Sequence, residues 1–483
     1  MKKNRFVSKL LLILSIISFG LVAFYLVKNG ILPIRYRKIF IIAGLAIYIL
    51  ATIIILARKS PKLLRGIAIV FITLLMLVFV FTFVFINKGL ITLDKLNRNA
   101  NDKVYMDFSI VVMKDSDYKS IEDIGEDYVY AAINTDNKNF KLFKEQFSKD
   151  NKIDINYADG KSYVSMAEDL LDGRSKIILL NENYRTSIED NRHEFSRKTK
   201  VIYSAKIEKK IHKDDLVKQK PVGENTPFNL YISGADTYSN NYSHARSDVN
   251  LLMTINPKTN QILITTIPRD SYIRIAGKGD NKKDKFTHSG IYGASSSIMS
   301  LENLFGIDIN YYAKVNFNSL INVVDALGGI EVDNAETFTS VLNKKTYKKG
   351  RIHLNGEDAL AFARERKHLT EGDLGRGKNH IRIVEGMINK AMSPAILLKY
   401  SKVLDVLSDS METNMPNNKI IDMINAQLDS NKDWKIESID LEGKGKMGLP
   451  SYAMPGYKLW FLVPDKSSIE NVSNKINSLL EAE

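Results

Sequence analysis

The sequence contains no cysteine in its 483 residues. This absence excludes disulfide bonds, thiolate nucleophiles and cysteine-ligated zinc or iron–sulfur sites. A chain without cysteine is compatible with an exported bacterial domain that folds without disulfides.

Acidic residues are missing from the first 93 positions, and Asp94 is the first of them. Residues 1–65 carry twelve Lys or Arg, and removing these from the 68 basic residues leaves 56 against 55 Asp and Glu. The net charge of residues 66–483 is therefore about +1, although the whole chain carries +13. The basic excess is a membrane-flanking signature rather than a groove for a polyanion, so no nucleic-acid partner is expected.

Three uncharged apolar runs lie in this basic region, at Leu10–Val27, Ile39–Ala57 and Gly66–Ile86. Each is long enough to cross a bilayer as a helix, which takes about 20 residues. No small-residue cleavage site follows the first run, so we interpret it as an uncleaved helix rather than a signal peptide. If residues 1–9 are cytoplasmic, three spans place the chain after about residue 88 outside. The basic residues divide four, four and four among the N-terminus and the two loops, which barely favours either orientation.

The remaining sequence predicts two soluble domains. Residues 100–225 alternate short apolar runs with helical patterns, which indicates a small α/β accessory domain. The polar stretch 206–227 has the composition of a linker. In residues 226–483, strands at 228–233, 249–255, 261–267 and 330–332 alternate with helical patterns such as 317–327. We expect an α/β/α domain with a mixed central sheet and helices on both faces.

Four segments of the second domain concentrate charge near predicted strand ends, where ligands of open α/β sheets bind. The first holds Asp236 and, further on, the triplet Arg246-Ser247-Asp248. The others are Ile267-Pro268-Arg269-Asp270, the run from Ala361 to Arg366, and the glycine-rich run from Gly372 to Arg382. Arginine forks suit bidentate contacts with phosphate, and aspartates among them could bind Mg²⁺ together with substrate phosphate oxygens. Together the segments indicate a pyrophosphate site.

Each segment taken alone also has a simpler interpretation. Asp236 and Asp270 could be turn or cap residues, and Arg246 with Asp248, or Arg269 with Asp270, could be surface ion pairs. Arg364 and Arg366 would share one face only if that stretch is extended, and they could belong to a solvated strand. Lys285 and His288 are expected on a loop surface. His380 has no second histidine at ligand spacing and is expected to be a structural partner rather than a metal ligand.

In these segments the chain resembles the LytR-CpsA-Psr family. The most specific matches are Arg246-Ser247-Asp248, Ile267–Asp270, Ala363–Arg366 and the Gly-Asp-Leu-Gly-Arg-Gly stretch from Gly372. The resemblance covers three spans, the accessory domain and a catalytic domain at 226–483. It implies a bacterial plasma-membrane protein with its catalytic domain outside the cell.

The resemblance implies an enzyme that transfers a glycopolymer, here a capsular polysaccharide, from a polyprenyl-pyrophosphate carrier to a peptidoglycan hydroxyl. Asp236 and Asp248 would hold Mg²⁺. The pyrophosphate would be bound by Arg246, Arg269, Arg364, Arg366 and Arg376. A glutamine is common in the family at the position of His380, which as a histidine can still donate one hydrogen bond to phosphate. Asp248 and Asp373 are both possible general bases, and the sequence does not choose between them.

Two questions stay open at this stage. The polyprenyl tail requires an apolar tunnel, which residues 317–324 and 381–388 could line, although ordinary core is the simpler reading of both. The second functional hypothesis is a non-enzymatic regulator or scaffold of capsule assembly, which would use residues 100–225 to bind other capsule-assembly proteins.

Overall fold

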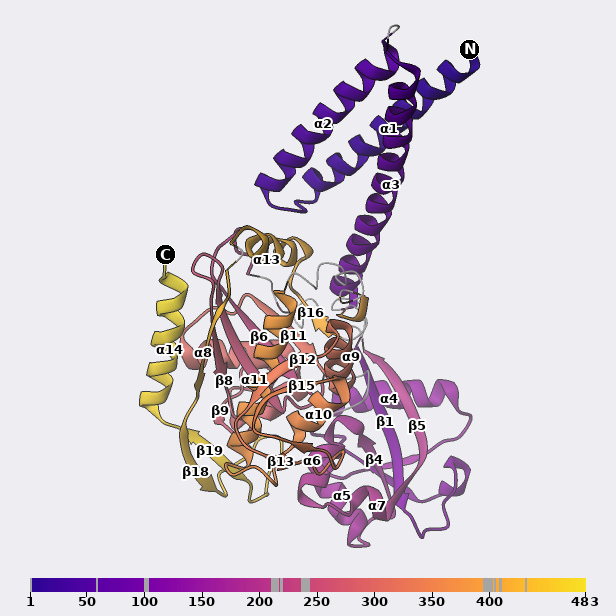
Figure 1. Cartoon of the computed structure of the whole chain (residues 1–483). Helices are drawn as coiled ribbons and strands as arrows, with labels where there is room; N and C mark the ends of the chain where they lie inside the picture. The colour runs from indigo at the N-terminus through magenta and orange to yellow at the C-terminus, as the bar shows by residue number, and fades with distance from the viewer. Residues whose placement is uncertain are drawn as a thin grey trace.

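The computed structural model describes residues 2–57, 60–99, 104–209, 217, 220–235, 244–393, 403, 405–407, 411–430 and 432–483. It has three parts (Figure 1): a group of long helices at the N-terminus, an accessory domain and a larger C-terminal domain. This is the expected fold class.

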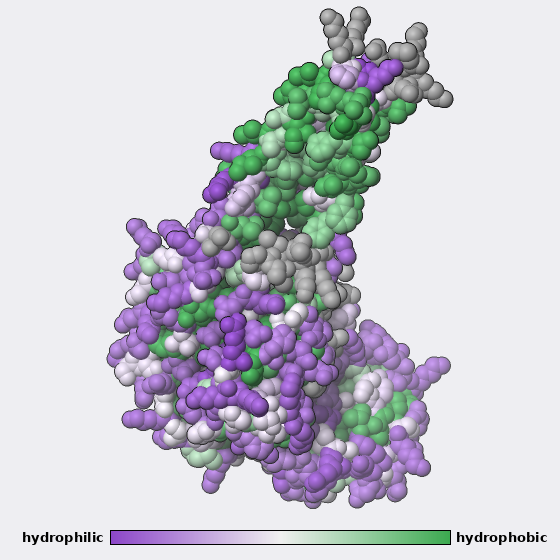
Figure 2. Space-filling view, viewed as in Figure 1, coloured by the Kyte–Doolittle hydropathy of each residue, from purple (hydrophilic) through white to green (hydrophobic). Residues whose placement is uncertain are grey.

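The N-terminal part consists of α1 (Lys2–Lys28), α2 (Ile34–Leu56) and α3 (Lys62–Asn99). Apolar stretches long enough to span a membrane occupy 6–28, 34–56 and 62–91, and they contain the predicted runs except for Ala57, one residue beyond the second stretch. Figure 2 shows the apolar surface over these helices, in contrast with the hydrophilic surface of the soluble domains. Inside the bundle, the Ser15 hydroxyl bonds the Tyr48 hydroxyl at 2.6 Å and the Ile72 carbonyl at 2.9 Å, which ties the three helices together.

The C-terminal domain contacts one end of the helix group. The Asn425 amide of α13 (Asn417–Ser430) donates to the Gly30 carbonyl between α1 and α2 at 2.7 Å. Lys88 of α3 lies 3.5 Å from Asp405, and Leu90 packs beside Ile421. The connection between α1 and α2 therefore lies at the same end of the helices as the soluble domains, whereas the N-terminus lies at the other end (Figure 1).

The accessory domain is built on a five-stranded sheet in the order β3-β2-β4-β1-β5. Its phenylalanine-rich helix α4 (Asn137–Asp150) buries Phe140, Phe143 and Phe147 because these residues recur at helical spacing. Strand β5 continues to Lys209, so the predicted linker at 206–227 was wrong at its first residues, which pair with β1 instead. The other elements are β1 (Val104–Met113), β2 (Tyr128–Ala131), β3 (Asn156–Asp159), α5 (Tyr163–Leu171), β4 (Ile177–Asn181), α6 (Arg185–Asn191), α7 (Phe195–Lys198) and β5 (Thr199–Lys209).

The C-terminal domain has a mixed six-stranded sheet in the order β16-β11-β6-β7-β8-β17. Strands β6 and β11 are parallel, as are β8 and β17, whereas the pairs β6–β7, β7–β8 and β11–β16 are antiparallel. These strands are β6 (Phe228–Gly234), β7 (Val249–Asn256), β8 (Gln261–Thr266), β11 (Tyr311–Val315), β16 (Met411–Thr413) and β17 (Lys435–Asp440).

Helices cover both faces of this sheet because its central strands are apolar on both sides. Leu252 of β7 packs with α8 (Ala294–Phe305) and α14 (Lys466–Glu481), whereas the neighbouring Leu251 and Met253 pack with α11 (Asp373–Ala391) and α13. The remaining elements are β9 (Tyr272–Arg274), β10 (Lys283–Lys285), α9 (Phe317–Leu327), β12 (Ile330–Asn334), β13 (Phe338–Thr339), β14 (Thr346–Tyr347), β15 (Gly350–Leu354), α10 (Gly356–Arg364), β18 (Gly443–Met447) and β19 (Trp460–Pro464).

The arrangement of the helices predicts which positions can be labelled from the same side of the membrane. In this cysteine-free chain, Ile31→Cys lies between α1 and α2, Lys466→Cys lies on the C-terminal domain, and Ser60→Cys lies between α2 and α3. We expect a membrane-impermeant maleimide to label the first two from the same side of the membrane and Ser60→Cys only from the opposite side. Labelling of Ser60→Cys and Lys466→Cys from one side would contradict this arrangement.

Candidate active site

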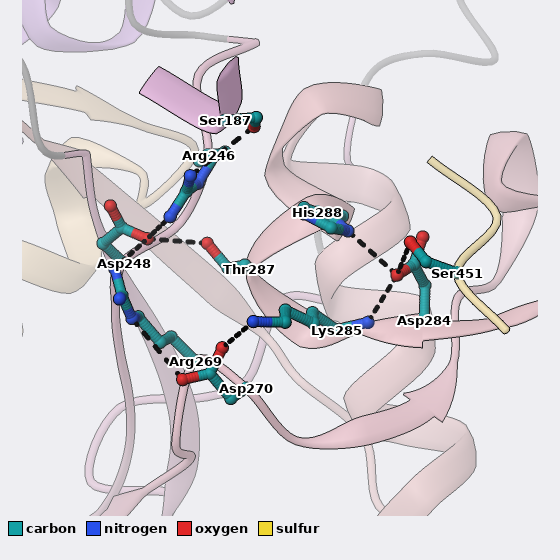
Figure 3. Close-up of polar contacts among 10 residues, drawn as sticks. All are labelled: Ser187, Arg246, Asp248, Arg269, Asp270, Asp284, Lys285, Thr287, His288 and Ser451. Atoms are coloured by element: carbon teal, nitrogen blue, oxygen red, sulfur yellow. Dashed lines mark hydrogen bonds and ion pairs between the residues drawn. The ribbon is translucent and has the colours of Figure 1, made fainter. Parts of the chain in front are cut away.

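Asp248 is the centre of the charged cluster, at the start of β7. Its Oδ1 accepts hydrogen bonds from Arg246 Nη2 at 3.0 Å, Arg269 Nη1 at 3.5 Å and the Thr287 hydroxyl at 2.7 Å (Figure 3). The side chains of Arg246 and Asp248 are only 6% and 7% exposed, so this is a buried ion pair rather than a surface one. Ser247, between them, points the other way and bonds Ser233 and Asn250 inside the domain.

Burial opposes ionisation of Asp248, but Arg246, Arg269 and the Thr287 hydroxyl outweigh it and hold the pKa of its carboxyl well below the ordinary value. A carboxylate this acidic is a poor general base, because its conjugate acid forms only far below neutral pH. The lowered pKa argues against proton abstraction, one of the two roles predicted for Asp248.

A second carboxylate extends the cluster. Arg269 Nε lies 3.7 Å from Asp270, and Asp270 in turn accepts from Lys285 Nζ at 2.6 Å. The prediction that Lys285 and His288 lie on a loop surface was wrong. The Lys285 side chain is 16% exposed and pairs with Asp270, and His288 is 2% exposed and bonds Asp284 at 2.9 Å.

The backbone at Gly290 packs closely against the backbone of residues 245–247. A Cβ on Gly290 would lie 2.5 Å from the Ala245 carbonyl oxygen and 2.7 Å from the Ser247 nitrogen, so only glycine fits there. The Ser247 amide donates to the Thr287 carbonyl, and the Thr287 amide donates to the Arg269 carbonyl. Residues about 40 apart in sequence are thereby joined around Asp248.

A cavity of about 720 Å³ opens beside Asp248. One end is charged, and its lining includes Asp248, Arg364, Arg366, Lys367, Arg376 and His380. The remainder is almost entirely apolar, with side chains from β6, β7, β11, α9 and α11 such as Leu230, Ile232, Met253, Leu320, Val323, Ile383, Val384, Met387 and Ile388. The two segments proposed as a tunnel lining or as ordinary core therefore line a cavity.

Arg364 and Arg366 reach this cavity in a different way from the extended stretch considered above. Helix α10 ends at Arg364, and Arg366 follows in a loop. Glu365 between them is 2% exposed and accepts the backbone amides of Val341, Arg366 and His368, which turns the chain so that both arginines face the cavity. The Arg364 guanidinium also stacks over the Phe317 ring at 4.5 Å, a contact worth about 0.5–2 kcal/mol.

His380, on α11, bonds the backbone at the end of α10, as expected of a structural partner. Its Nε2 lies 3.0 Å from the Ala363 carbonyl oxygen, which can only accept, so Nε2 carries the proton. Burial and the neighbouring Arg376 lower the pKa of His380 to about 4, so the ring is neutral at pH 7 and its Nδ1 is an acceptor. The neutral ring therefore has no N–H left to donate to a phosphate.

The structure therefore joins Asp248 to Arg246 and Arg269 and brings it to the same cavity as Arg364, Arg366, Arg376 and His380. Asp236 lies outside the described residues. Asp373 is the first residue of α11, and its side chain is outside the described part of the chain, so neither its role nor that of Asp236 is tested.

One buried atom suits a metal ion. Asp248 Oδ2 has no hydrogen-bond partner among the described residues, although it is inaccessible to solvent. A carboxylate oxygen is a hard ligand of the kind that Mg²⁺ prefers. The described residues contain no group of three or more metal-binding side chains.

Sequence reasoning missed Thr287 and Lys367 at this site. Thr287 lies 39 positions from Asp248 and carries no motif of its own, and Lys367 simply follows the arginine pair. No pattern in the nearby sequence could have predicted the contact between Thr287 and Asp248.

Comparison with known proteins agrees with the motifs. Residues 195–477 match the model of the LytR_cpsA_psr family, which covers more than half of the chain. The chain belongs to the LytR-CpsA-Psr family. A second model, DNA polymerase processivity factor, matches residues 64–180, a smaller part of the chain that begins within the apolar helix α3.

Two curated members of the family illustrate the relationship. The polyisoprenyl-teichoic acid–peptidoglycan teichoic acid transferase TagU of Bacillus anthracis (strain CDC 684 / NRRL 3495) is 33% identical over 261 residues, which are 54% of this chain and 81% of that protein. TagU of Bacillus subtilis (strain 168) is 31% identical, over 55% of this chain and 81% of that protein.

Solved structures of LytR-CpsA-Psr proteins also match. The crystal structure of B. subtilis TagU aligns with a TM-score of 0.42 at 29% identity, covering 53% of this chain and 98% of that one. That of B. subtilis TagV aligns with a TM-score of 0.47 at 27% identity, covering 54% and 100%.

We predict that His380→Gln preserves the site, because a glutamine amide can donate to the Ala363 carbonyl as Nε2 does. The wild-type ring should titrate near pH 4 instead of 6.5, which NMR of the labelled imidazole measures. Because the unfolded state binds this proton more readily, His380 should reduce stability as the pH falls from 6.5 towards 4. His380→Gln should lack that part of the pH dependence, and a ring titrating near 6.5 in the folded protein would contradict the assignment.

Proposed function

We propose that the protein is a membrane-anchored phosphotransferase that moves a glycopolymer from a polyprenyl-pyrophosphate carrier to a peptidoglycan hydroxyl. The observation that carries this proposal is a cavity with a cationic mouth and an apolar interior, on a domain that follows three membrane-spanning helices. A polyprenyl pyrophosphate has the same two halves, an anionic head and an apolar tail. The names of the related TagU proteins, which are polyisoprenyl-teichoic acid–peptidoglycan transferases, support the same reaction class.

In the proposed reaction, the acceptor hydroxyl oxygen attacks the phosphorus that bears the sugar. The bond from that phosphorus to the bridging oxygen breaks, polyprenyl monophosphate leaves, and the hydroxyl proton passes to a base or to solvent. The product is a phosphodiester between polymer and peptidoglycan. Arg364, Arg366 and Arg376 at the cavity mouth would bind the pyrophosphate oxygens and stabilise the negative charge that develops on the leaving group.

Arg246 and Arg269 would act through Asp248, which both of them contact. Their charges keep Asp248 ionised, and its Oδ2 would then hold Mg²⁺, with Asp236 as the second proposed ligand. When bound, the ion would supply further neutralisation of the pyrophosphate.

The apolar cavity walls would hold the first isoprene units of the tail. Side chains of α9 and α11 both line this space, so the isoprene units that enter it stay out of water, as they do in the bilayer. Anchoring to the membrane keeps the site close to a carrier whose tail otherwise lies in the bilayer.

We propose that the soluble domains are extracellular. The N-terminus and the α2–α3 connection lie at one end of the helices, and together their sequences hold eight of the twelve basic residues of positions 1–65. The α1–α2 connection, at the end nearest the soluble domains, holds four. Lys88, Lys95 and Arg98 follow the third span, on the same side as the α1–α2 connection, so the positive-inside rule barely favours either orientation and the proposal rests on the family resemblance.

Purified full-length protein with Mg²⁺ should release polyprenyl monophosphate from a glycan-linked polyprenyl pyrophosphate. We expect Arg269→Ala and Asp248→Ala each to lower kcat/KM by roughly 100-fold or more, because the first removes a cation that holds Asp248 ionised and the second removes the proposed Mg²⁺ ligand. Product release is measured by phosphate-labelled lipid chromatography, with capsular and teichoic acid donors compared in parallel because the family resemblance and the TagU relatives suggest different polymers.

The matched controls are Arg351→Ala and Asp333→Ala, an exposed cross-strand pair on β15 and β12. These should retain wild-type rates. Full activity of both Arg269→Ala and Asp248→Ala would refute the site. Normal polymer attachment in cells that carry the double mutant would favour the scaffold hypothesis.

A substitution that fills the apolar part of the cavity should weaken binding of the polyprenyl tail without affecting binding of the pyrophosphate. We expect Leu320→Trp to raise KM roughly tenfold for a long polyprenyl donor by excluding isoprene units, while a donor with a two-isoprene tail is turned over normally. Val201→Trp, at an exposed position of β5, is the control. Equal effects of Leu320→Trp on both donors would rule out the cavity as the tail site.

A further inference from the structure

A segment of the C-terminal domain packs against the accessory domain. Met454 and Leu459, in the connection between β18 and β19, and Phe461, at the start of β19, belong to the same buried hydrophobic cluster as the accessory core and are 3%, 7% and 0% exposed. We call residues 449–461 the inserted segment. The hydrophobic core of the accessory domain is therefore completed by residues that follow the catalytic cluster by about 200 positions.

The inserted segment is attached to one buried carboxylate. Asp284, fully buried on β10, accepts the Ser451 hydroxyl at 2.7 Å and the Ala453 amide at 2.6 Å. The same carboxylate accepts His288 Nδ1 at 2.9 Å and the Lys285 amide at 2.7 Å (Figure 3). Asp284 thus joins the inserted segment to Lys285 and His288, which follow Asp284 in the sequence.

Those following residues reach the candidate active site directly. Lys285 binds Asp270, the partner of Arg269, and its ammonium lies 5.7 Å from the centre of the buried Phe461 ring. Thr287 donates its hydroxyl to Asp248. A second backbone link runs from β19, where the Leu462 amide donates to the Asp270 carbonyl at 2.9 Å.

The accessory domain also contacts the cluster itself. Ser187 of α6 is 1% exposed and lies 3.5 Å from Arg246 Nη1, on the opposite side of that guanidinium group from Asp248 (Figure 3). Arg246 and Arg269, the two arginines that hold Asp248, are therefore each connected to the accessory domain by a separate route.

We propose that the accessory domain is the structural second half of the active site, and that Asp284 and Lys285 are positioning residues which transmit its support to Arg269 and Asp248. The proposal depends on the transferase function given above. It assigns the accessory domain a role in the reaction itself, because a displacement of about 1 Å in a charged site can cost about 100-fold in rate.

The test compares two identical substitutions in one core. Met454→Ala loosens the inserted segment, whereas Met166→Ala alters α5 beside Gly160, and both side chains are almost fully buried. We expect Met454→Ala to lower kcat roughly tenfold with KM changed less than about twofold. It should also raise amide hydrogen exchange at Ser247 and Thr287, whose backbone bonds surround Asp248. Met166→Ala, at comparable loss of thermal stability, should do neither.

A second pair of variants isolates the charge on Lys285. Lys285→Met should lower kcat roughly tenfold and Lys285→Arg should restore most of it, while Lys176→Met, which breaks an exposed ion pair with Asp127, should have no effect. Ser451→Ala removes a single bond to Asp284 and serves if Met454→Ala does not fold.

Equal rates and equal exchange in the two methionine variants would overturn the proposal, as would full activity of Lys285→Met. If the wild-type protein performs no transfer, the proposed function fails, but the exchange measurement still decides whether the accessory domain supports the cluster.

Discussion

The structure around the candidate site depends on the ionised state of one buried carboxylate. Asp248 has little contact with solvent, and its charge is tolerated because two guanidinium groups and a hydroxyl surround Oδ1. Removing one partner from such a buried pair typically costs 3–5 kcal/mol, since an uncompensated charge remains. The neighbouring backbone bonds, Gly290 against the Ala245 carbonyl and Thr287 against Arg269, hold these partners in place.

This constraint explains why several distant segments meet at one point. Arg246 and Asp248 enter β7, Arg269 follows β8, and Thr287 comes after β10, so their convergence requires the sheet order in which β7 and β8 are neighbours. Beside them, α10 and α11 bring the remaining arginines to a cavity whose walls are apolar. The charged and the apolar parts of this cavity adjoin because strand ends and helix faces meet at this edge of the sheet.

Much of the fold was predictable because it follows from patterns among residues that are close together in the sequence. The apolar runs predicted the three spanning helices, since few other structures tolerate about 20 uncharged residues. Alternation of strands and helices predicted the mixed sheet. Local patterns failed where a contact was distant: β5 extends through Lys209 because it pairs with β1, and His288 and Lys285 are buried because Asp284 and Asp270 lie beside them.

The sequence by itself determined the three long apolar helices, the near neutrality of residues 66–483 and the identity of the arginines that meet at the cavity with Asp248, because these depend on composition and on motifs a few residues long. Only the tertiary structure decided how those residues act. It lowered the pKa of the Asp248 carboxyl through Arg246 and Arg269, fixed the proton of His380 on Nε2 through the Ala363 carbonyl, and made the apolar faces of α9 and α11 cavity walls. It also packed residues 449–461 against the accessory domain. Each of these results depends on burial and on partners distant in sequence, and neither is encoded within a short stretch of chain.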